Sequence, residues 1–187
     1  ALVTAKDLME LDADSEALAG DKRKGFIERY IHGEIYRARP EVMAVVHSHS
    51  PSSIPFGVTK SRLRPVYHMG AFLWSGTPVF DIRKVKAEND LLVRDRPLGA
   101  ALAKALGSCT CVLMRGHGMT VVGDGVPEAV YRAIYTEMNA RLQIQAGQLE
   151  GPIEFLSDEE GRRSTAANRG TLERPWELWK KQALGRR

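Results

Sequence analysis

The sequence predicts a single α/β domain in which helices cover a β-sheet. Short apolar runs with the length of strands alternate with segments of helical periodicity along most of the chain. The chain has 187 residues, of which 43% are hydrophobic, so it can build one substantial core but is too short for two ordinary domains. Neither an internal repeat nor a low-complexity segment interrupts this order.

The first half of the chain is expected to contain a helix at 26–39, a strand at 43–49 and extended runs at 65–72 and 78–82. Ile27, Ile31 and Ile35 recur every four residues, so they lie on one face of the predicted helix, which Pro40 ends. A Gly-Thr-Pro turn separates the two extended runs.

The second half is expected to contain a helix at 98–106, strands at 109–114 and 119–122, and a long helix that opens within 124–128 and runs to about residue 149. Gly107 ends the first of these helices. Pro127 and Glu128 suit the first turn of the long helix, where a missing amide hydrogen costs nothing and an acidic side chain is favourable.

The last part of the chain differs in composition. Residues 150–168 are polar and charged, whereas 176–184 is a candidate short helix that carries Trp176 and Trp179. Such a tail packs on its own domain, is disordered, or docks on a neighbouring subunit. The two tryptophans argue against disorder for this helix because large aromatic side chains need burial.

Charge limits the expected partners. The net charge of +4 is modest, and basic residues do not interleave with aromatic ones as they do on nucleic-acid-binding platforms. Most of these charges are expected to lie on a solvated surface. One or two arginines are expected to bind a small anionic substrate, and nucleic acid is not an expected partner.

Cysteine content and hydropathy indicate the compartment. Cys109 and Cys111 are the only cysteines, so the chain has no disulfide framework and a reducing cytoplasm is expected. The sequence contains no apolar stretch of about 18 residues and no signal-like start. Neither membrane insertion nor secretion is therefore expected.

Three histidines at strand ends predict a metal site. His47 and His49 are two residues apart at the end of a predicted strand, so both imidazoles point to the same side. His117 lies on a glycine-bracketed turn after another predicted strand. A lone histidine at a strand end is more often a hydrogen-bonded surface or core residue. Three of them together favour a divalent transition metal such as zinc, because strand ends are where α/β sheets place their sites.

Motifs around these histidines resemble the class II aldolase/adducin family. The similar stretches are 28–40, 45–49 and 113–118. In that family a glutamate before the H-x-H strand and three histidines bind a divalent metal, usually zinc or manganese. The matching positions here are Glu28, His47, His49 and His117.

The resemblance implies a three-layer α/β/α sandwich with a mixed central sheet, and a homotetramer with sites between adjacent subunits. It covers about residues 1–150, the expected catalytic domain, and leaves 151–187 as a tail with a short helix. Family members have a further helix and a strand pair ahead of the segment that begins here at Ala1. The resemblance thus implies either a missing N-terminal portion or an unusually short protein.

Two departures separate this chain from the sugar-phosphate aldolases of the family. Those aldolases hold phosphate with a Ser-Ser pair that Phe26 and Ile27 replace here, and the region aligned with their acidic tyrosine is 67–70. Stretches 31–40, 64–69 and 77–83 instead look closest to the decarboxylase branch. Its members include 3-hydroxy-2-methylpyridine-4,5-dicarboxylate decarboxylase and dihydroxyphthalate decarboxylases.

The resemblance therefore implies a metal-dependent decarboxylase of a hydroxylated pyridine or benzene dicarboxylate. A sugar-phosphate aldolase or epimerase is the alternative enzyme, and a non-catalytic adducin-like module is the alternative of another class. Such modules lack the intact histidine set.

Individual roles follow from this expected chemistry. Glu28 either handles protons or is a fixed fourth ligand, and His32, one helical turn away, orients it or donates the proton. Arg64 is expected to grip the carboxylate that the substrate keeps, with Tyr67 and His68 as further substrate-binding residues.

Overall fold

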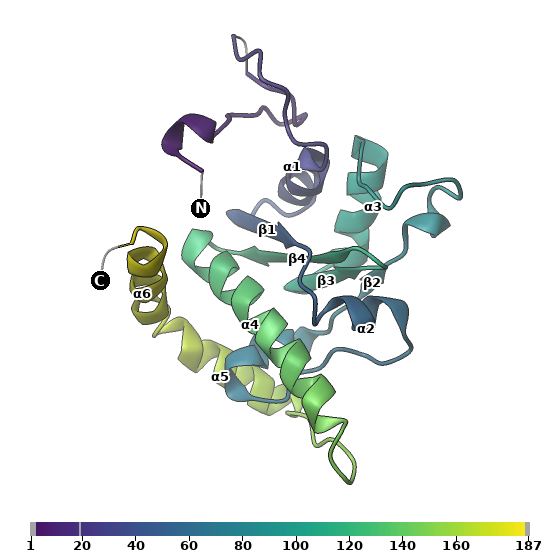
Figure 1. Cartoon of the computed structure of the whole chain (residues 1–187), viewed down its shortest axis with the longest axis vertical. Coiled ribbons are helices and arrows are strands. Elements are labelled where there is room, and N and C mark those ends of the chain that lie inside the picture. Colours follow the sequence, from purple (N-terminus) through teal and green to yellow (C-terminus); the bar gives the residue numbers. More distant parts are fainter. Residues whose placement is uncertain (1–2, 19, 186–187) are drawn as a thin grey trace.

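The computed structural model describes residues 3–18 and 20–185 and has three layers. In Figure 1 a four-stranded sheet lies between α1 and α3 on one face and α4 on the other. The helices span Arg29–Ala38 (α1), Arg96–Leu106 (α3) and Val126–Ala146 (α4). This confirms the predicted α/β/α sandwich. Ala1, where the stretch that resembles the family begins, lies outside the residues that the structure describes.

The sheet is mixed, as predicted. Its order is β1-β4-β3-β2, with strands at Ala44–Ser48 (β1), Gly118–Gly123 (β4), Cys111–Met114 (β3) and Val79–Phe80 (β2). β4 pairs antiparallel with both β1 and β3, whereas β2 pairs parallel with β3. The register sets His47 opposite Thr120, so the end of β1 lies beside the start of β4.

Successive side chains of each strand point to opposite faces of the sheet, so the core is divided into two clusters. Val112 and Met114 pack among the residues of α1 and α3, whereas Cys111 and Leu113 pack on the face that α4 covers. Val45 belongs to the first cluster. His47, two residues further along β1, therefore faces the α1 side of the sheet.

The prediction of an extended run at 65–72 is wrong for the second half of that segment. Residues His68–Ser75 form the 3-10 helix η2. Gly70, Ala71, Phe72 and Leu73 are buried in succession, and a strand could bury consecutive residues only if both its faces were covered. The short helix instead packs them against α4 and α5.

Helix boundaries and short elements also differ from expectation. The helix predicted from residue 26 begins at Arg29, which leaves Glu28 at its N-cap position. The other short elements, for which the sequence analysis proposed no helix, are Ala5–Asp7 (η1), Ile54–Val58 (α2) and Ile82–Lys84 (η3). The last of these shortens the predicted run at 78–82 to the two residues of β2.

The C-terminal segment folds against the domain through two helices, Asp158–Arg169 (α5) and Glu173–Ala183 (α6). The sequence analysis predicted the second but not the first. Ser157 and Glu160 form a capping box at the start of α5, and Gly161 packs directly on the side chain of Trp74. Trp179 of α6 lies against Tyr135 of α4. Among the described helices, none is both long and apolar enough to cross a membrane.

Candidate metal centre

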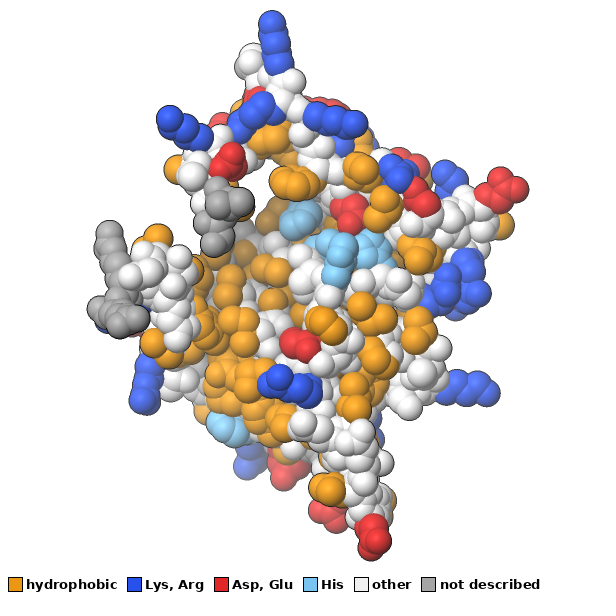
Figure 2. Space-filling model, viewed as in Figure 1, with side chains coloured by type: hydrophobic (Ala, Val, Ile, Leu, Met, Phe, Trp, Pro, Cys, Tyr) orange, Lys and Arg blue, Asp and Glu red, His pale blue; other side chains and the backbone are white. Residues whose placement is uncertain are grey.

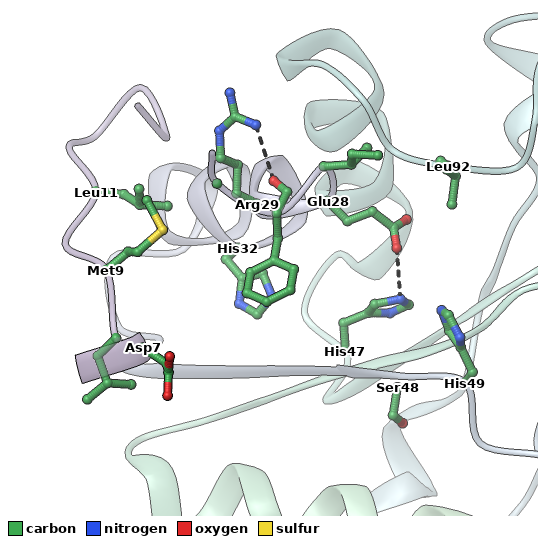
Figure 3. A pocket seen from close by; sticks show the side chains of 14 residues that line it. Asp7, Met9, Leu11, Glu28, Arg29, His32, His47, Ser48, His49 and Leu92 are labelled. Carbon is green, nitrogen blue, oxygen red and sulfur yellow. Dashed lines mark hydrogen bonds and ion pairs between the residues drawn. The ribbon is translucent and has the colours of Figure 1, made fainter. Parts of the chain in front are cut away.

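Four side chains converge where β1 ends. Glu28 lies at the N-cap of α1, His47 near the end of β1, His49 just beyond it, and His117 in the turn between β3 and β4. Their potential ligand atoms all lie within 4.8 Å of one another. Figure 3 shows the Glu28 carboxylate pointing from the start of α1 onto His47, with His49 beside it. The structure thus brings together the four predicted ligands.

The distances within the cluster fit a common bound cation. One carboxylate oxygen of Glu28, Oε2, lies 3.4 Å from Nε2 of His47 and 3.4 Å from Nε2 of His117. Nε2 of His117 lies 2.9 Å from Nε2 of His49. All three imidazoles therefore direct the same nitrogen at one small volume, together with an anionic oxygen.

Hydrogen bonds to backbone carbonyls determine the tautomers of two of these histidines. Nδ1 of His47 lies 3.0 Å from the carbonyl oxygen of Met119, and Nδ1 of His117 lies 2.8 Å from that of Leu91. A carbonyl only accepts, so each Nδ1 carries the hydrogen and leaves the lone pair on Nε2. Nε2 of His47 is buried and has no hydrogen-bond partner among the described residues. A metal ion would satisfy it, so the residues fit the implied metal.

Electrostatics keep the glutamate ionised. Burial by itself would raise the pKa of Glu28, but the imidazoles of His117 and His47, each 3.4 Å away, and a hydrogen bond from the Val93 amide hold that pKa well below its usual range. The same contact with Glu28 raises the pKa of His117, against the opposing effect of burial. The centre therefore offers a carboxylate and three nitrogen donors, a set that suits zinc and manganese alike.

Glycines around His117 allow its turn to approach β1. Gly116 adopts a φ of 66°, in the left-handed region that glycine enters without strain. A Cβ on Gly118 would lie 3.0 Å from Cα of His49 and would clash with the carbonyl oxygen of Ser48. The glycine bracket thus has a physical role: it brings the third histidine against the other two.

The site also uses a backbone carbonyl, that of Leu91, which no side-chain pattern in the sequence could indicate. Leu91 is a non-glycine residue with a φ of 69°, and its carbonyl oxygen orients His117. Backbone strain of this kind clusters at functional sites. The Asn89 side chain, which accepts a hydrogen bond from the Leu91 amide at 3.1 Å, marks a turn here. Because every residue has a carbonyl, the sequence could not single this one out.

A cavity of about 850 Å³ adjoins the metal cluster. Figure 2 shows histidine side chains at the edge of a hollow beside the N-terminal segment. Its lining is mostly apolar and includes Met9, Leu11, Phe26, Ile27 and Leu92. Arg29 is the one arginine or lysine among the described lining residues, and its guanidinium is already bonded to the Ser15 carbonyl and the Glu16 carboxylate.

The remaining predicted site residues divide into two groups. His32 lines the cavity, where burial lowers its pKa, but among the described contacts it makes no hydrogen bond to Glu28. Arg64, Tyr67 and His68 do not line this cavity. The Arg64 guanidinium lies 4.2 Å from the Phe155 ring, and Tyr67 packs near Tyr135 on α4. Within one chain, the structure therefore separates these three from the metal cluster.

Comparison with known proteins identifies the family. The family model described as "Class II Aldolase and Adducin N-terminal domain" matches residues 1–144. The chain belongs to this family. L-fuculose 1-phosphate aldolase from Glaciozyma antarctica PI12 has the same fold, with a TM-score of 0.75 at 20% identity over 100% of this chain and 73% of that one.

Relatives within the family include named decarboxylases. Decarboxylase tropJ of Talaromyces stipitatus is 42% identical over 176 residues, which cover 83% of this chain and 66% of that protein. The 3,4-dihydroxyphthalate decarboxylase of Arthrobacter keyseri is 33% identical over 162 residues, covering 84% and 64%. Human beta-adducin is 29% identical over 127 residues, covering 67% and 16%. The chain spans about two thirds of the length of the two decarboxylases.

Proposed function

We propose that this chain is a metal-dependent carboxy-lyase that removes carbon dioxide from a hydroxylated aromatic carboxylate. The observation that supports it most is the intact cluster of Glu28 and three histidines, whose Nε2 atoms converge beside a largely apolar cavity. Similarity to two proteins named as decarboxylases supports the reaction class. A non-catalytic adducin-like module would have no use for a complete ligand set.

Glu28, His47, His49 and His117 would hold the ion. When bound, a divalent metal supplies Lewis-acid stabilisation of negative charge on a substrate oxygen next to the breaking bond. In His47 and His117, the hydrogen bond from Nδ1 to a backbone carbonyl already directs the Nε2 lone pair toward the place of the ion. The choice between zinc and manganese stays open, because both accept these donors.

The proton balance gives Glu28 its second proposed role. When carbon dioxide leaves, the electrons of the broken carbon–carbon bond stay on the ring carbon, which must then receive a proton. Glu28 lines the cavity and would deliver that proton after taking it up from solvent, and His32 in the same cavity is the second candidate donor. The alternative, in which Glu28 acts only as a fixed ligand, is tested below.

The cavity lining favours an aromatic substrate over a sugar phosphate. Phe26 and Ile27 offer apolar surface where phosphate binding needs hydroxyls, and the guanidinium of Arg29 is engaged by other groups. A pyridine or benzene ring with a hydroxyl beside its carboxylate would bury its faces on such a lining. An aldolase or epimerase of sugar phosphates would lack a free cation here among the described residues.

Arg64, Tyr67 and His68 are proposed to bind the substrate of a neighbouring subunit. The proposal depends on the homotetramer that the family resemblance implies, with sites between subunits. Arg64 and His68 are exposed and so are accessible to a second chain, whereas the Tyr67 hydroxyl is buried and would have to be uncovered in the assembly. An arginine from a neighbouring subunit would supply the positive charge that the cavity lacks, and this charge would bind the carboxylate that a dicarboxylate substrate keeps. The tetramer and the cytoplasmic location stay predictions.

The deciding experiment is an activity screen of the protein loaded with zinc or manganese. Hydroxylated pyridine and benzene dicarboxylates are assayed for release of carbon dioxide, and sugar phosphates for aldol cleavage. We expect turnover of at least one aromatic acid, lost in His117→Ala. Aldol cleavage without any decarboxylation would reassign the reaction, and metal-independent turnover would refute the role of the cluster.

A further inference from the structure

Among the three histidine ligands, His49 has the fewest hydrogen bonds to residues that the structure describes. His47 and His117 each donate through Nδ1 to a carbonyl, whereas the exposed His49 lies beyond the end of β1. In the described part of the chain, its ring makes one hydrogen-bond contact, with Nε2 of His117 at 2.9 Å. That contact joins two ligand atoms, so it cannot orient the ring once both bind an ion. The direction of His49 must therefore come from the backbone around it.

A carboxylate from the opposite layer holds the backbone that follows His49. Oε2 of Glu137 accepts hydrogen bonds from the Ser50 hydroxyl and, at 3.0 Å, from the Ser52 amide, while Oε1 accepts from the Ser52 hydroxyl at 2.5 Å. Ser50 is buried and Glu137 is half-buried. Glu137 belongs to α4, which covers the face of the sheet opposite α1 (Figure 1).

Further contacts fix the backbone both before and after His49. The Ser53 hydroxyl and amide donate to the Ser50 carbonyl at 2.8 and 3.1 Å, which closes the turn. On the other side, Gly118 packs directly on the backbone of Ser48 and His49. His49 thus lies between a backbone contact with β4 and a serine turn anchored by Glu137.

We propose that Glu137 is a positioning residue for the metal ligand His49, acting through Ser50 and Ser52. The inference rests on the proposed metal centre. A carboxylate suits the role because it only accepts, and all three of its partners donate. In Glu137→Gln the negative charge is lost and one oxygen becomes an NH2 group that only donates, so the contacts with the serine turn are weakened and the hydroxyl that faces this group must turn round to accept. Glu137 does not belong to the ligand cluster itself.

The test measures zinc affinity, by competition with a chromophoric chelator, in the metal-free protein and its variants. Supporting contacts of this kind are worth about 10- to 100-fold in metal affinity, so we expect Glu137→Gln to weaken zinc binding by that factor. The matched control is Asn139→Ala on the same helix. Its amide bonds the backbone of Arg64 and Val66, away from His49, so zinc affinity should be unchanged even if the melting temperature falls.

A second comparison separates positioning from general stability. If Glu137 acts through His49, adding Glu137→Gln to His49→Ala should cost no further zinc affinity. Ser52→Ala, which removes one donor to Glu137, should cause a smaller loss in the same direction and serves if Glu137→Gln does not fold. Cobalt substituted for zinc should show a changed visible spectrum in Glu137→Gln.

Each outcome has one meaning. Unchanged zinc affinity in Glu137→Gln and Ser52→Ala, or an additive loss in the double variant, would refute the positioning role and leave the metal centre intact. A fall in Asn139→Ala equal to that in Glu137→Gln would also refute it, because the effect would then be general. If the unaltered protein binds no divalent ion, the proposed metal centre fails and this inference fails with it.

Discussion

At the metal cluster, a hydrogen bond at Nδ1 leaves Nε2 free to bind an ion in two of the three histidines. His47 and His117 donate through Nδ1 to the carbonyls of Met119 and Leu91, so their Nε2 atoms enter the site as bases. Glu28 adds the negative charge that offsets a divalent ion, and its contacts with the two imidazoles and the Val93 amide hold its pKa low despite burial. Side chains thus supply the ligand atoms, whereas backbone carbonyls orient two of the three imidazoles.

One divalent ion should bind per chain. Because the three histidines share one site, His47→Ala and His117→Ala should each remove most of the bound ion and the activity with it. Elemental analysis of the purified variants checks the prediction. Full occupancy in the double variant would show that the ion lies elsewhere, and His68→Ala, outside the cluster, is the matched control that should keep its metal.

Glu28→Gln separates the two proposed roles of this residue. Three imidazoles remain as ligands, so the variant should retain much of its metal, while turnover should fall by roughly 10²- to 10⁴-fold if the carboxyl group transfers the proton. Metal content and steady-state kinetics are measured on the same sample. A turnover near that of the parent would leave Glu28 with a structural role alone.

At the scale of elements, the site depends on how closely β1 approaches β4. β1 ends and β4 begins at the cluster, and the turn 115–118 brings His117 back toward His49 although the two are 68 residues apart in sequence. The approach is possible because Gly118 presents no side chain to the Ser48 carbonyl. The strand pair therefore determines the site as well as the core.

Gly118→Ala should damage stability and metal binding together. The added methyl must push β1 away from β4, and forced overpacking of this kind costs about 1–3 kcal/mol of unfolding free energy. Urea unfolding and zinc affinity are both measured. Gly125→Ala is the control, since a Cβ there would meet Pro127 at 3.8 Å, an ordinary contact. Equal effects of the two substitutions would contradict the packing argument.

At the scale of the whole molecule, the three layers all contribute to one site: α1 supplies Glu28 at its N-cap, the sheet supplies the histidines, and α4 supplies Glu137 from the far side. An ion held by groups from separate segments binds the folded chain far better than the unfolded one. Metal binding and global stability are therefore linked.

Zinc should raise the melting temperature in a pH-dependent way. At a free concentration 100 times the dissociation constant, binding adds about 2.7 kcal/mol to the unfolding free energy. Protons compete for the imidazoles, and since the contact with Glu28 raises the pKa of His117 in the metal-free protein, this competition begins at a higher pH than for an ordinary histidine. The zinc-induced shift should be large at pH 8 and small at pH 5.5. A shift independent of pH would contradict binding by histidine.

The proposed homotetramer makes a testable prediction for Arg64. Arg64→Lys should raise KM for a dicarboxylate much more than for the matching monocarboxylate, because lysine cannot reproduce the planar, two-pronged grip of a guanidinium. If Arg64 serves a neighbouring subunit, mixing Glu28→Gln chains with Arg64→Ala chains should restore part of the lost activity. Equal KM changes for both substrates would rule the role out, and no recovery in chains that are unfolded and refolded together would refute a role for Arg64 in a neighbouring subunit's site.

Patterns of side-chain type along the chain sufficed to predict the α/β fold, the strands that hold the histidines and the three histidines of the metal cluster. These features are local: strand alternation, helical spacing and the H-x-H pair each occupy a few consecutive residues. The family resemblance linked Glu28 to the histidines, which spacing alone did not.

Tertiary structure alone decided the rest. It replaced the expected extended run by the 3-10 helix at His68–Ser75, added the polar helix α5 and separated Arg64 from the cavity of its own chain. It also assigned the Leu91 carbonyl to His117 and the Glu137 carboxylate to the turn after His49. Such contacts join segments distant in sequence, and a carbonyl or a single glutamate bears no local sign of its partner. They exist only once burial of the core has brought the layers together.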